Sequence, residues 1–367
     1  MASSISARHY GTTPAGQPVE AWTLTGRGGL GLEIITLGGI VTRMLVPGRD
    51  GLSADVVLGF DELQSYIAGR QYFGAITGRV AGRIAGAAFT LDNRIYQLAD
   101  NDAPNHLHGG ICGLDKRVWS ATSVARPDGT PSLRLSYHSP DAEEGYPGNI
   151  DIGVTYTITD DNTFLIETEA ISDQLTPLNL THHSYFNLSG ESHGSVADHL
   201  LTIFADQFVP TGEHMRLQGR LEPVGPGNDF RCPRRLGEMI PLLFQQHGDL
   251  YALRGGQAGE MKLAAHCEDP VSGRAMTVST TNSYLQFYTG RFLDGSHIGK
   301  SGVAYGPHAG LCLECHGYPD AADARLRSDI LLQPGRTQRH ATAYAFSVGA
   351  EEPKPISRRT LRIPECS

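Results

Sequence analysis

The stretch Asp151-Ile-Gly-Val-Thr-Tyr-Thr-Ile-Thr-Asp-Asp-Asn-Thr-Phe-Leu-Ile-Glu-Thr-Glu-Ala-Ile171 carries the clearest structural signal in the sequence. Thr155, Thr157 and Thr159 alternate with apolar or aromatic residues until the turn formers Asp160-Asp161-Asn162 interrupt the pattern. A period of two is typical of a strand whose two faces differ, and Asp and Asn favour turns. The stretch therefore predicts a β-hairpin of two antiparallel strands.

The same pattern continues in both directions along the chain. β-Branched and aromatic residues between turn formers predict further strands or hairpins at Leu32–Val46 (broken at Gly38-Gly39), Ala87–Leu98, Val118–Ser139, Leu200–Val209, Met276–Thr289, Gly310–Cys315 and Ala341–Val348. Two short helices are expected at Glu62–Ala68 and Arg234–Phe244. The segment Gln245–Pro270 has the least regular pattern, and we expect an irregular loop over one face there. Strands and helices do not alternate regularly, so we expect an all-β fold, a large antiparallel β-sandwich with a few short helices.

Composition agrees with a folded chain that turns often. The 367 residues include 44 Gly and 21 Pro, yet 40% are hydrophobic, which is enough for a sizeable core. Neither a repeat nor a Pro/Ser-rich linker divides the sequence. We therefore expect a single domain over residues 1–367, with its core at about 11–348.

Charge and hydropathy exclude several classes of partner. A net charge of −9 argues against nucleic acid or an anionic membrane. The longest apolar stretches, such as Leu30–Val46, are broken by polar residues, and the first ten residues lack an apolar signal core. We expect a soluble, cytoplasmic protein, and the sequence leaves open whether it is a monomer or a homodimer. Six Cys in this length do not make a disulfide framework.

Two motifs imitate cofactor sites. Gly26-Arg-Gly28-Gly-Leu-Gly31 matches a dinucleotide fingerprint, but strand-like residues follow it where a phosphate-binding helix is required. Cys312-Leu-Glu-Cys315-His316 matches a haem attachment pattern, but alternation along a strand points the two Cys to opposite faces. We expect a turn at the first motif and an ordinary strand at the second.

The pair His106 and His108 is a minor candidate for metal binding. Two ligands on one strand face suit a metal site, but the nearest following carboxylate is Asp115. We therefore expect neither a metal nor another cofactor, and keep this pair as the alternative.

Glu314 and two His blocks suggest proton chemistry. Glu314 lies in an apolar strand, where a carboxylate is either paired, exposed at the strand end, or set for proton transfer. His108 precedes Gly109-Gly110, a pair that permits close backbone approach, and His183 lies in an aromatic stretch. An imidazole titrates near neutrality, which suits a general acid or base. Local pattern alone leaves these alternatives open.

Several separate blocks together resemble a known family. In chain order they are Gly78-Arg-Val-Ala-Gly-Arg83-Ile, Asn105-His-Leu-His108-Gly-Gly, Glu144-Gly-Tyr-Pro-Gly148-Asn, His183-Ser-Tyr-Phe-Asn187-Leu, Asn228-Asp-Phe-Arg231, Gln286-Phe-Tyr-Thr-Gly290, and Cys312-Leu-Glu314 with Tyr318-Pro-Asp320-Ala. From about Gly11 to Val348 the chain resembles the aldose 1-epimerases, or galactose mutarotases. The resemblance implies the antiparallel supersandwich of that family, which the strand pattern predicts independently.

The resemblance also implies an activity and a site. The family interconverts the α and β anomers of free aldoses without a cofactor. Glu314 matches its catalytic base, His183 its catalytic acid, and His108 a residue that hydrogen-bonds the ring oxygen or a nearby hydroxyl. The other matching residues hold the monosaccharide hydroxyls and are Arg83, Asp229 and Gln286.

Alternatives and departures accompany this assignment. A non-catalytic sugar-binding protein on the same scaffold is the first alternative, and a glycosidase that pairs Asp229 with Glu314 is another. The chain departs from the family's usual residues at Gly82, His182, Cys315 and His316, and in the segment His247-Gly-Asp-Leu-Tyr251. These departures leave open whether galactose, glucose, a pentose or another sugar is preferred.

Overall fold

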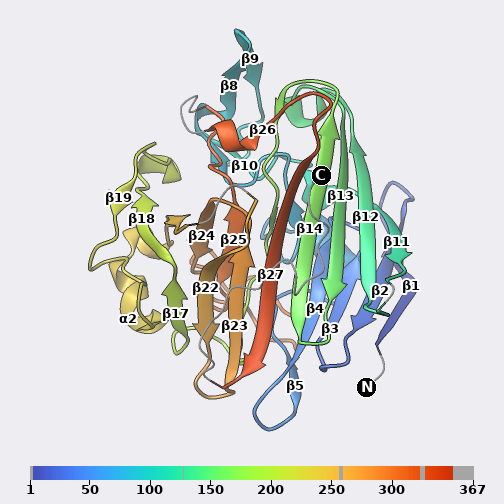
Figure 1. Ribbon diagram of the computed structural model, residues 1–367, viewed down its shortest axis with the longest axis vertical. Coiled ribbons are helices and arrows are strands. Elements are labelled where there is room, and N and C mark those ends of the chain that lie inside the picture. The colour runs from blue at the N-terminus through green and yellow to red at the C-terminus, as the bar shows by residue number, and fades with distance from the viewer. Residues whose placement is uncertain (1–2, 127, 256–258, 323–326, 350–367) are drawn as a thin grey trace.

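The computed structural model describes residues 3–126, 128–255, 259–322 and 327–349. Strands dominate this part of the chain, helices are short, and every ladder between named strands is antiparallel. These features confirm the expected all-β antiparallel architecture. Figure 1 shows the strands arranged in layers, with one hairpin, β8–β9, projecting at the top of the molecule.

The largest sheet has nine strands and includes the hairpin expected at 151–171. Its strands, in spatial order, are β11 (Ser120–Val124), β12 (Ser132–Ser139), β13 (Ile150–Ile158), β14 (Thr163–Ser172), β27 (Gln338–Val348), β23 (Arg274–Thr280), β22 (Lys262–Glu268), β17 (Leu200–Ile203) and β20 (Arg234–Arg235). The hairpin register runs from Ile150 opposite Ser172 to Ile158 opposite Phe164. The alternation therefore predicts both strands and the turn between them.

Two five-stranded sheets complete the main layers. The first is ordered β1 (Ser4–Thr12), β2 (Pro18–Thr25), β3 (Gly31–Ile35), β4 (Ile40–Pro47) and β5 (Ser53–Asp55). The second is ordered β19 (Glu222–Pro223), β18 (Ala205–Val209), β21 (Leu250–Leu253), β24 (Tyr284–Tyr288) and β25 (Cys312–His316). The apparent dinucleotide motif runs from Gly26, directly after β2, to Gly31, the first residue of β3, so it connects two antiparallel strands, as expected.

Short pairs and helical turns connect these sheets. The two-stranded pairs are β6 (Ile76–Thr77) with β16 (Thr181–His182), β7 (Arg83–Ile84) with β10 (His106–Leu107), β8 (Ala88–Leu91) with β9 (Arg94–Gln97), and β15 (Thr176–Pro177) with β26 (Leu331–Leu332). The helices are α1 (Leu63–Ala68), α2 (Leu236–Met239), and the 3₁₀ turns η1 (Ala85–Ala87), η2 (Leu114–Lys116), η3 (Glu143–Gly145), η4 (Glu213–Met215), η5 (Ile240–Leu242), η6 (Phe244–Gln246) and η7 (Arg327–Ile330). None of the helices in the described residues is long and apolar enough to cross a bilayer.

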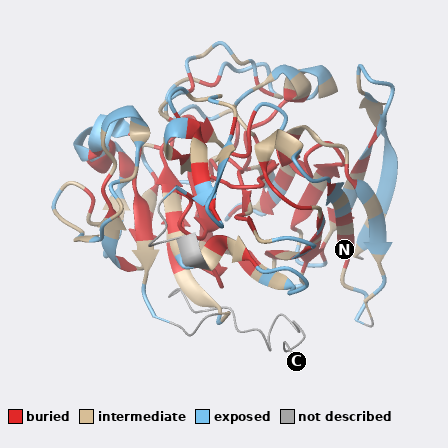
Figure 2. Cartoon of the chain, turned by 90° about the horizontal axis from the view of Figure 1, so that it is seen from above, coloured by how far each residue is buried: buried red, intermediate tan, exposed pale blue. Residues whose placement is uncertain are grey.

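The hydrophobic core lies between the large sheet and the two smaller ones. Buried side chains from all three sheets form one cluster, represented by Ile34 of the first small sheet, Tyr156 of the large sheet and Phe287 of the second small sheet. Figure 2 shows the buried residues gathered inside and the exposed ones on the outer faces. Burial of these faces from water supplies the main driving force for the fold.

Three expectations about strands are wrong in detail. The stretches expected at 200–209 and 276–289 each divide into two strands that belong to different sheets, β17 with β18 and β23 with β24. The segment 245–270, expected to be irregular, contributes β21 and β22. A strand pattern does not reveal where the chain passes from one layer to the next, because both layers bury alternate residues.

Candidate functional site

A pocket of about 180 Å³ lies beside the β24–β25 ladder. Gln286 and Tyr288 of β24 line the pocket, whereas the intervening Phe287 belongs to the core. Glu314 and His316 of β25 likewise line the pocket, whereas Leu313 and Cys315 belong to the core. The period of two therefore places alternate residues of each strand in the pocket, on the face opposite the core.

The same alternation accounts for the apparent haem motif. Cys312 shares the pocket face, with its Sγ 3.7 Å from Nδ1 of His183, while Cys315 packs in the main core. The two sulfurs thus belong to opposite faces of β25, as expected from the strand pattern. Burial raises the pKa of the Cys312 thiol well above its usual value, so the group stays protonated.

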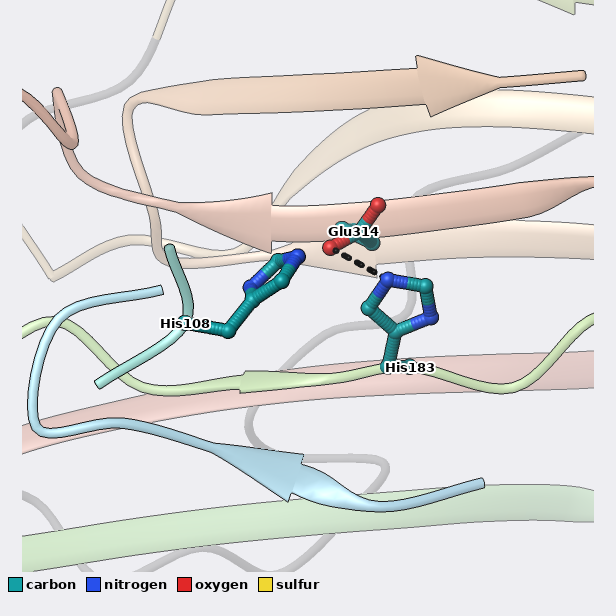
Figure 3. Close-up of side chains that lie close together, drawn as sticks. All are labelled: His108, His183 and Glu314. Atoms are coloured by element: carbon teal, nitrogen blue, oxygen red, sulfur yellow. Dashed lines mark ion pairs between the residues drawn. The ribbon is translucent and has the colours of Figure 1, made fainter. Parts of the chain in front are cut away.

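His183 and Glu314 form the centre of the pocket. His183 directly follows β16, and its Nε2 lies 3.5 Å from Oε2 of Glu314. Their side chains are each only 4% exposed, so the pair is shielded from water. Figure 3 shows these two side chains and His108 pointing toward one another from three separate segments.

His108 is positioned by an unusual backbone. His108, Gly109 and Gly110 have successive φ angles of 50°, 87° and 112°. A Cβ on Gly109 would lie 1.8 Å from the Gly78 carbonyl oxygen, so only glycine permits this approach. The Nδ1 atom of His108 accepts a hydrogen bond of 3.1 Å from the Gly82 N–H. The neutral ring therefore carries its hydrogen on Nε2.

Burial controls the protonation of the central pair. It raises the pKa of the Glu314 carboxyl to about 8, against a smaller lowering by the Arg83 charge. It also lowers the pKa of His183 to about 4. Both shifts favour the uncharged forms of Glu314 and His183. The pair therefore holds a single proton around neutral pH. One mobile proton between two adjacent groups is the requirement for coupled acid–base chemistry.

Two more of the expected binding residues reach this pocket. Arg83 and Gln286 both line it, and Arg83 is held by a 2.7 Å ion pair between its Nε and Asp102. Asp102 engages Nε, which leaves the two terminal guanidinium nitrogens of Arg83 as further donors that could reach a ligand.

Asp229, which the resemblance implies as a residue that holds the sugar, lies outside the lining of this pocket. Both of its carboxylate oxygens accept hydrogen bonds from Arg231, at 3.0 and 2.7 Å. The Arg231 guanidinium, two residues away, also lowers the pKa of Asp229 to about 2. The motif Asn228–Arg231 forms a local ion pair, and the carboxylate is occupied.

Tyr72 was not singled out from the sequence, whereas His316 and the segment that begins at His247 were noted there as departures from the family pattern. The Tyr72 ring packs 4.7 Å from that of His108 and 5.8 Å from that of His183. His247 and His316 also line the pocket. Alternation from Glu314 could have identified His316, whereas Tyr72 and His247 lie outside strands and carry no periodic signal.

The departures from the family pattern divide between two environments. Gly82 and His316 line the pocket. His182 and Cys315 instead line a separate small cavity, together with Tyr344 and other core residues. Gly82, His316 and, from the departing segment 247–251, His247 are therefore placed to contact a ligand in the pocket.

The structure brings together a different set of possible metal ligands from the pair His106 and His108. His106 binds the Ala99 carbonyl through Nδ1 and packs on Tyr146, so it does not converge with His108, which lies beyond the strand end. Within the described residues, potential ligand atoms of His108, His183 and Glu314 lie within 4.8 Å of one another. A metal-bound His normally donates from its other nitrogen, but Nδ1 of His108 accepts. This tautomer suits hydrogen bonding to a ligand better than metal coordination.

Comparison with known proteins identifies relatives over most of the chain. The chain is 40% identical to galactose mutarotase of Bos taurus over 348 residues, which cover 94% of this chain and 99% of the relative. It is 32% identical to aldose 1-epimerase of Escherichia coli, with coverage of 91% and 96%.

Solved structures and a family profile agree. An aldose epimerase homologue from C. elegans superposes with a TM-score of 0.82 at 26% identity, covering 95% of this chain and 100% of that one. Galactose 1-epimerase from Lactobacillus acidophilus gives 0.82 at 24% identity, with the same coverage, and supports the fold. The profile of the family described as Aldose 1-epimerase matches residues 20–345. The chain therefore belongs to the aldose 1-epimerase family.

Proposed function

We propose that this member of the family interconverts the α and β anomers of a free aldose, with Glu314 as general base and His183 as general acid. The observation that carries the assignment is the 3.5 Å contact between these two groups in a shielded pocket. Ring opening of an aldose requires proton removal at one oxygen and proton delivery at another. The pair supplies both functions without a change in redox state.

The reaction follows from these two positions. In the reactive form of the pair the single proton lies on His183 and Glu314 is ionised. Glu314 then removes the proton from the C1 hydroxyl while His183 protonates the ring oxygen, and the bond between C1 and the ring oxygen breaks. The resulting aldehyde rotates about its C1–C2 bond. Return of the protons closes the ring from the opposite face and inverts C1. The two groups then hold the same total number of protons as before.

The remaining contacts orient the sugar. His108 offers its Nε2–H to the ring oxygen or a neighbouring hydroxyl, because its Nδ1 is already engaged by Gly82. Arg83 and Gln286 are placed to hold other hydroxyls, and Asp229 has no part in this proposal. Fixed donors and acceptors hold the sugar in a reactive geometry before any proton moves.

The glycosidase alternative lacks its second carboxylate. Among the described residues that line the pocket, Glu314 is the sole carboxylic acid, whereas glycosidases commonly use two that flank the bond. The sugar-binding alternative differs from the enzyme only in turnover, so an activity measurement separates the two.

Polarimetry tests the proposal directly. Fresh α-D-galactose, α-D-glucose and other pure anomers should reach equilibrium faster with the protein than without it. Galactose leads the panel because several relatives are named galactose mutarotase. Sugar binding without acceleration for any member of a broad panel would instead support the binding-protein alternative.

A further inference from the structure

Two histidines in the pocket have no role in the proton transfers. His316 is the last residue of β25, and His247 lies between η6 and β21. Both line the pocket, and they are only 1% and 8% exposed. A buried imidazole that faces a ligand pocket needs a hydrogen-bond partner there, because an unsatisfied polar group is costly.

Their backbone contacts identify the tautomer of each ring. Nδ1 of His316 lies 2.6 Å from the Gly317 carbonyl oxygen, and Nδ1 of His247 lies 3.1 Å from the Gly248 carbonyl oxygen. A carbonyl oxygen only accepts hydrogen bonds, so Nδ1 carries the hydrogen in both rings. In the neutral form, each Nε2 is then a lone-pair acceptor.

His108 has the opposite polarity. Its Nδ1 accepts from the Gly82 N–H, so its Nε2 donates. The pocket therefore combines one imidazole that donates with two that accept. Hydroxyl groups both donate and accept, and such a mixed lining matches a neutral polyol.

The two acceptors lie on opposite sides of the catalytic carboxylate. His316 is two residues beyond Glu314 on the same strand face. In the other direction, Cys312 pairs with Tyr288, and the Tyr288 ring packs 4.8 Å from that of His247. The rings of His316 and His247 thus lie on either side of Glu314 along β25. They are therefore placed to reach different parts of one bound sugar.

Both rings remain neutral at ordinary pH. Burial lowers the pKa of His316 to about 4, and burial together with the nearby Arg83 charge lowers that of His247 to about 4. Acceptor character is therefore kept across the neutral range. The other titratable or charged groups that line the pocket are Glu314, His183, His108, Arg70, Arg83, Tyr72, Tyr185 and Tyr288.

We propose that His247 and His316 are specificity-determining residues, each accepting through Nε2 a hydrogen bond from a different hydroxyl of the bound aldose. This inference rests on the proposed function and specifies its substrate class. The substrate is a neutral aldose with free hydroxyls at both contacted positions, and a deoxy sugar that lacks either hydroxyl is a poorer one.

Crossing variants with deoxy sugars tests the pairing. Anomer exchange is measured at equilibrium by NMR exchange spectroscopy for D-galactose and its 2-, 3-, 4- and 6-deoxy forms. In the wild type, removal of a contacted hydroxyl should lower kcat/KM about tenfold, because it leaves a buried acceptor unpaired. In His316→Phe or His247→Phe, the penalty for one of those deoxy sugars should fall below about twofold, and the position should differ between the variants.

Conservative and remote variants supply the controls. His316→Gln retains an acceptor and should recover part of the wild-type discrimination. His138→Phe removes an exposed ring on β12 outside the pocket and should leave every ratio unchanged. Circular dichroism checks that each variant is folded. The proposal is overturned if both pocket variants show the same deoxy penalties as the wild type.

Nitrogen NMR separates this inference from the proposed function. The ¹⁵N spectrum of the wild type should show an unprotonated Nε2 for His247 and His316, and both signals should move when D-galactose binds. Protonated Nε2 atoms would overturn the acceptor roles even in an active enzyme. Absence of anomer exchange with every sugar would overturn the proposed function, while the ¹⁵N result would still decide the histidine roles.

Discussion

The pocket side and the core side of β25 and of the neighbouring strand β16 carry similar residues with different roles. His183 and its neighbour His182 are 3% and 5% exposed, and burial lowers the pKa of the two rings to about 4 and about 3. His183 meets Glu314 and His108, whereas His182 packs on the rings of Phe164 and Tyr344. Burial and a shifted pKa therefore do not define a catalytic group. His183 is distinguished from His182 by its contact with a second proton-transfer group, Glu314.

The largest expected effect is on the pocket face of β25. Glu314→Gln should lower kcat by about 1,000- to 10,000-fold, because the amide cannot accept the C1 hydroxyl proton. Polarimetry with fresh α-D-galactose, corrected for spontaneous mutarotation, measures the loss. Cys315→Ala changes the adjacent residue on the core face and should stay within about threefold of wild type. Similar losses in both variants would contradict the distinction between the faces.

The next contrast uses the adjacent histidines. His183→Asn should lower kcat by about 100- to 1,000-fold, because Asn cannot transfer a proton. The loss is smaller than for Glu314 because the His108 ring, 5.0 Å from that of His183, offers another N–H donor. The matched variant His182→Asn should retain activity within about threefold. A large loss in His182→Asn, with fold intact by circular dichroism, would refute the contrast.

The pH profile sharpens the account of the catalytic pair. Below about pH 4 the pair gains a second proton, and above about pH 8 it loses its only one, given the pKa values of His183 and Glu314. The kcat/KM profile should therefore form a plateau between these limits and fall tenfold per pH unit outside them. A profile that keeps rising above pH 9, after correction for the spontaneous reaction, would be inconsistent with this pair.

The smallest effect concerns the core face and acid stability. The pKa of His182 is lowered in the folded state to about 3, so the unfolded chain binds the extra proton below its normal value of about 6.5. Stability present above pH 6.5 is then lost as the pH falls toward 3. Replacing His182 by Asn should reduce the loss of unfolding free energy between pH 7 and 5 by about 2 kcal/mol. Urea unfolding at the two pH values measures the difference, and identical pH dependences would contradict it.

The alternation of residues along the sequence predicted the features that depend on strand periodicity. The hairpin at 151–171 and the opposite directions of Cys312 and Cys315 follow from a period of two, which one sequence contains. His316 follows from the same rule once Glu314 is chosen. The positions of Tyr72 and His247 depend instead on loops folding across the ladder.

Two further expectations meet contacts that strand periodicity does not describe. Asp229 belongs to a motif of the family, but the guanidinium of Arg231 occupies its carboxylate. The division of 200–209 between two sheets follows from a change of layer at Phe204, whose N–H binds the Ala264 carbonyl. The change of layer at Phe204 has no signature in local composition, because it is decided by a partner distant in sequence, whereas the Arg231 that pairs with Asp229 is visible in the motif itself.

The pairing of Glu314 with Gln286 has a consequence for how the enzyme tolerates change. A slip of β25 by a single residue would exchange Glu314 for Leu313, placing a carboxylate in the apolar interior and a leucine in the pocket. The register of β25 that folds correctly is thus also the register that places Glu314 in the pocket. An insertion in this ladder would abolish both the correct register and the placement of Glu314.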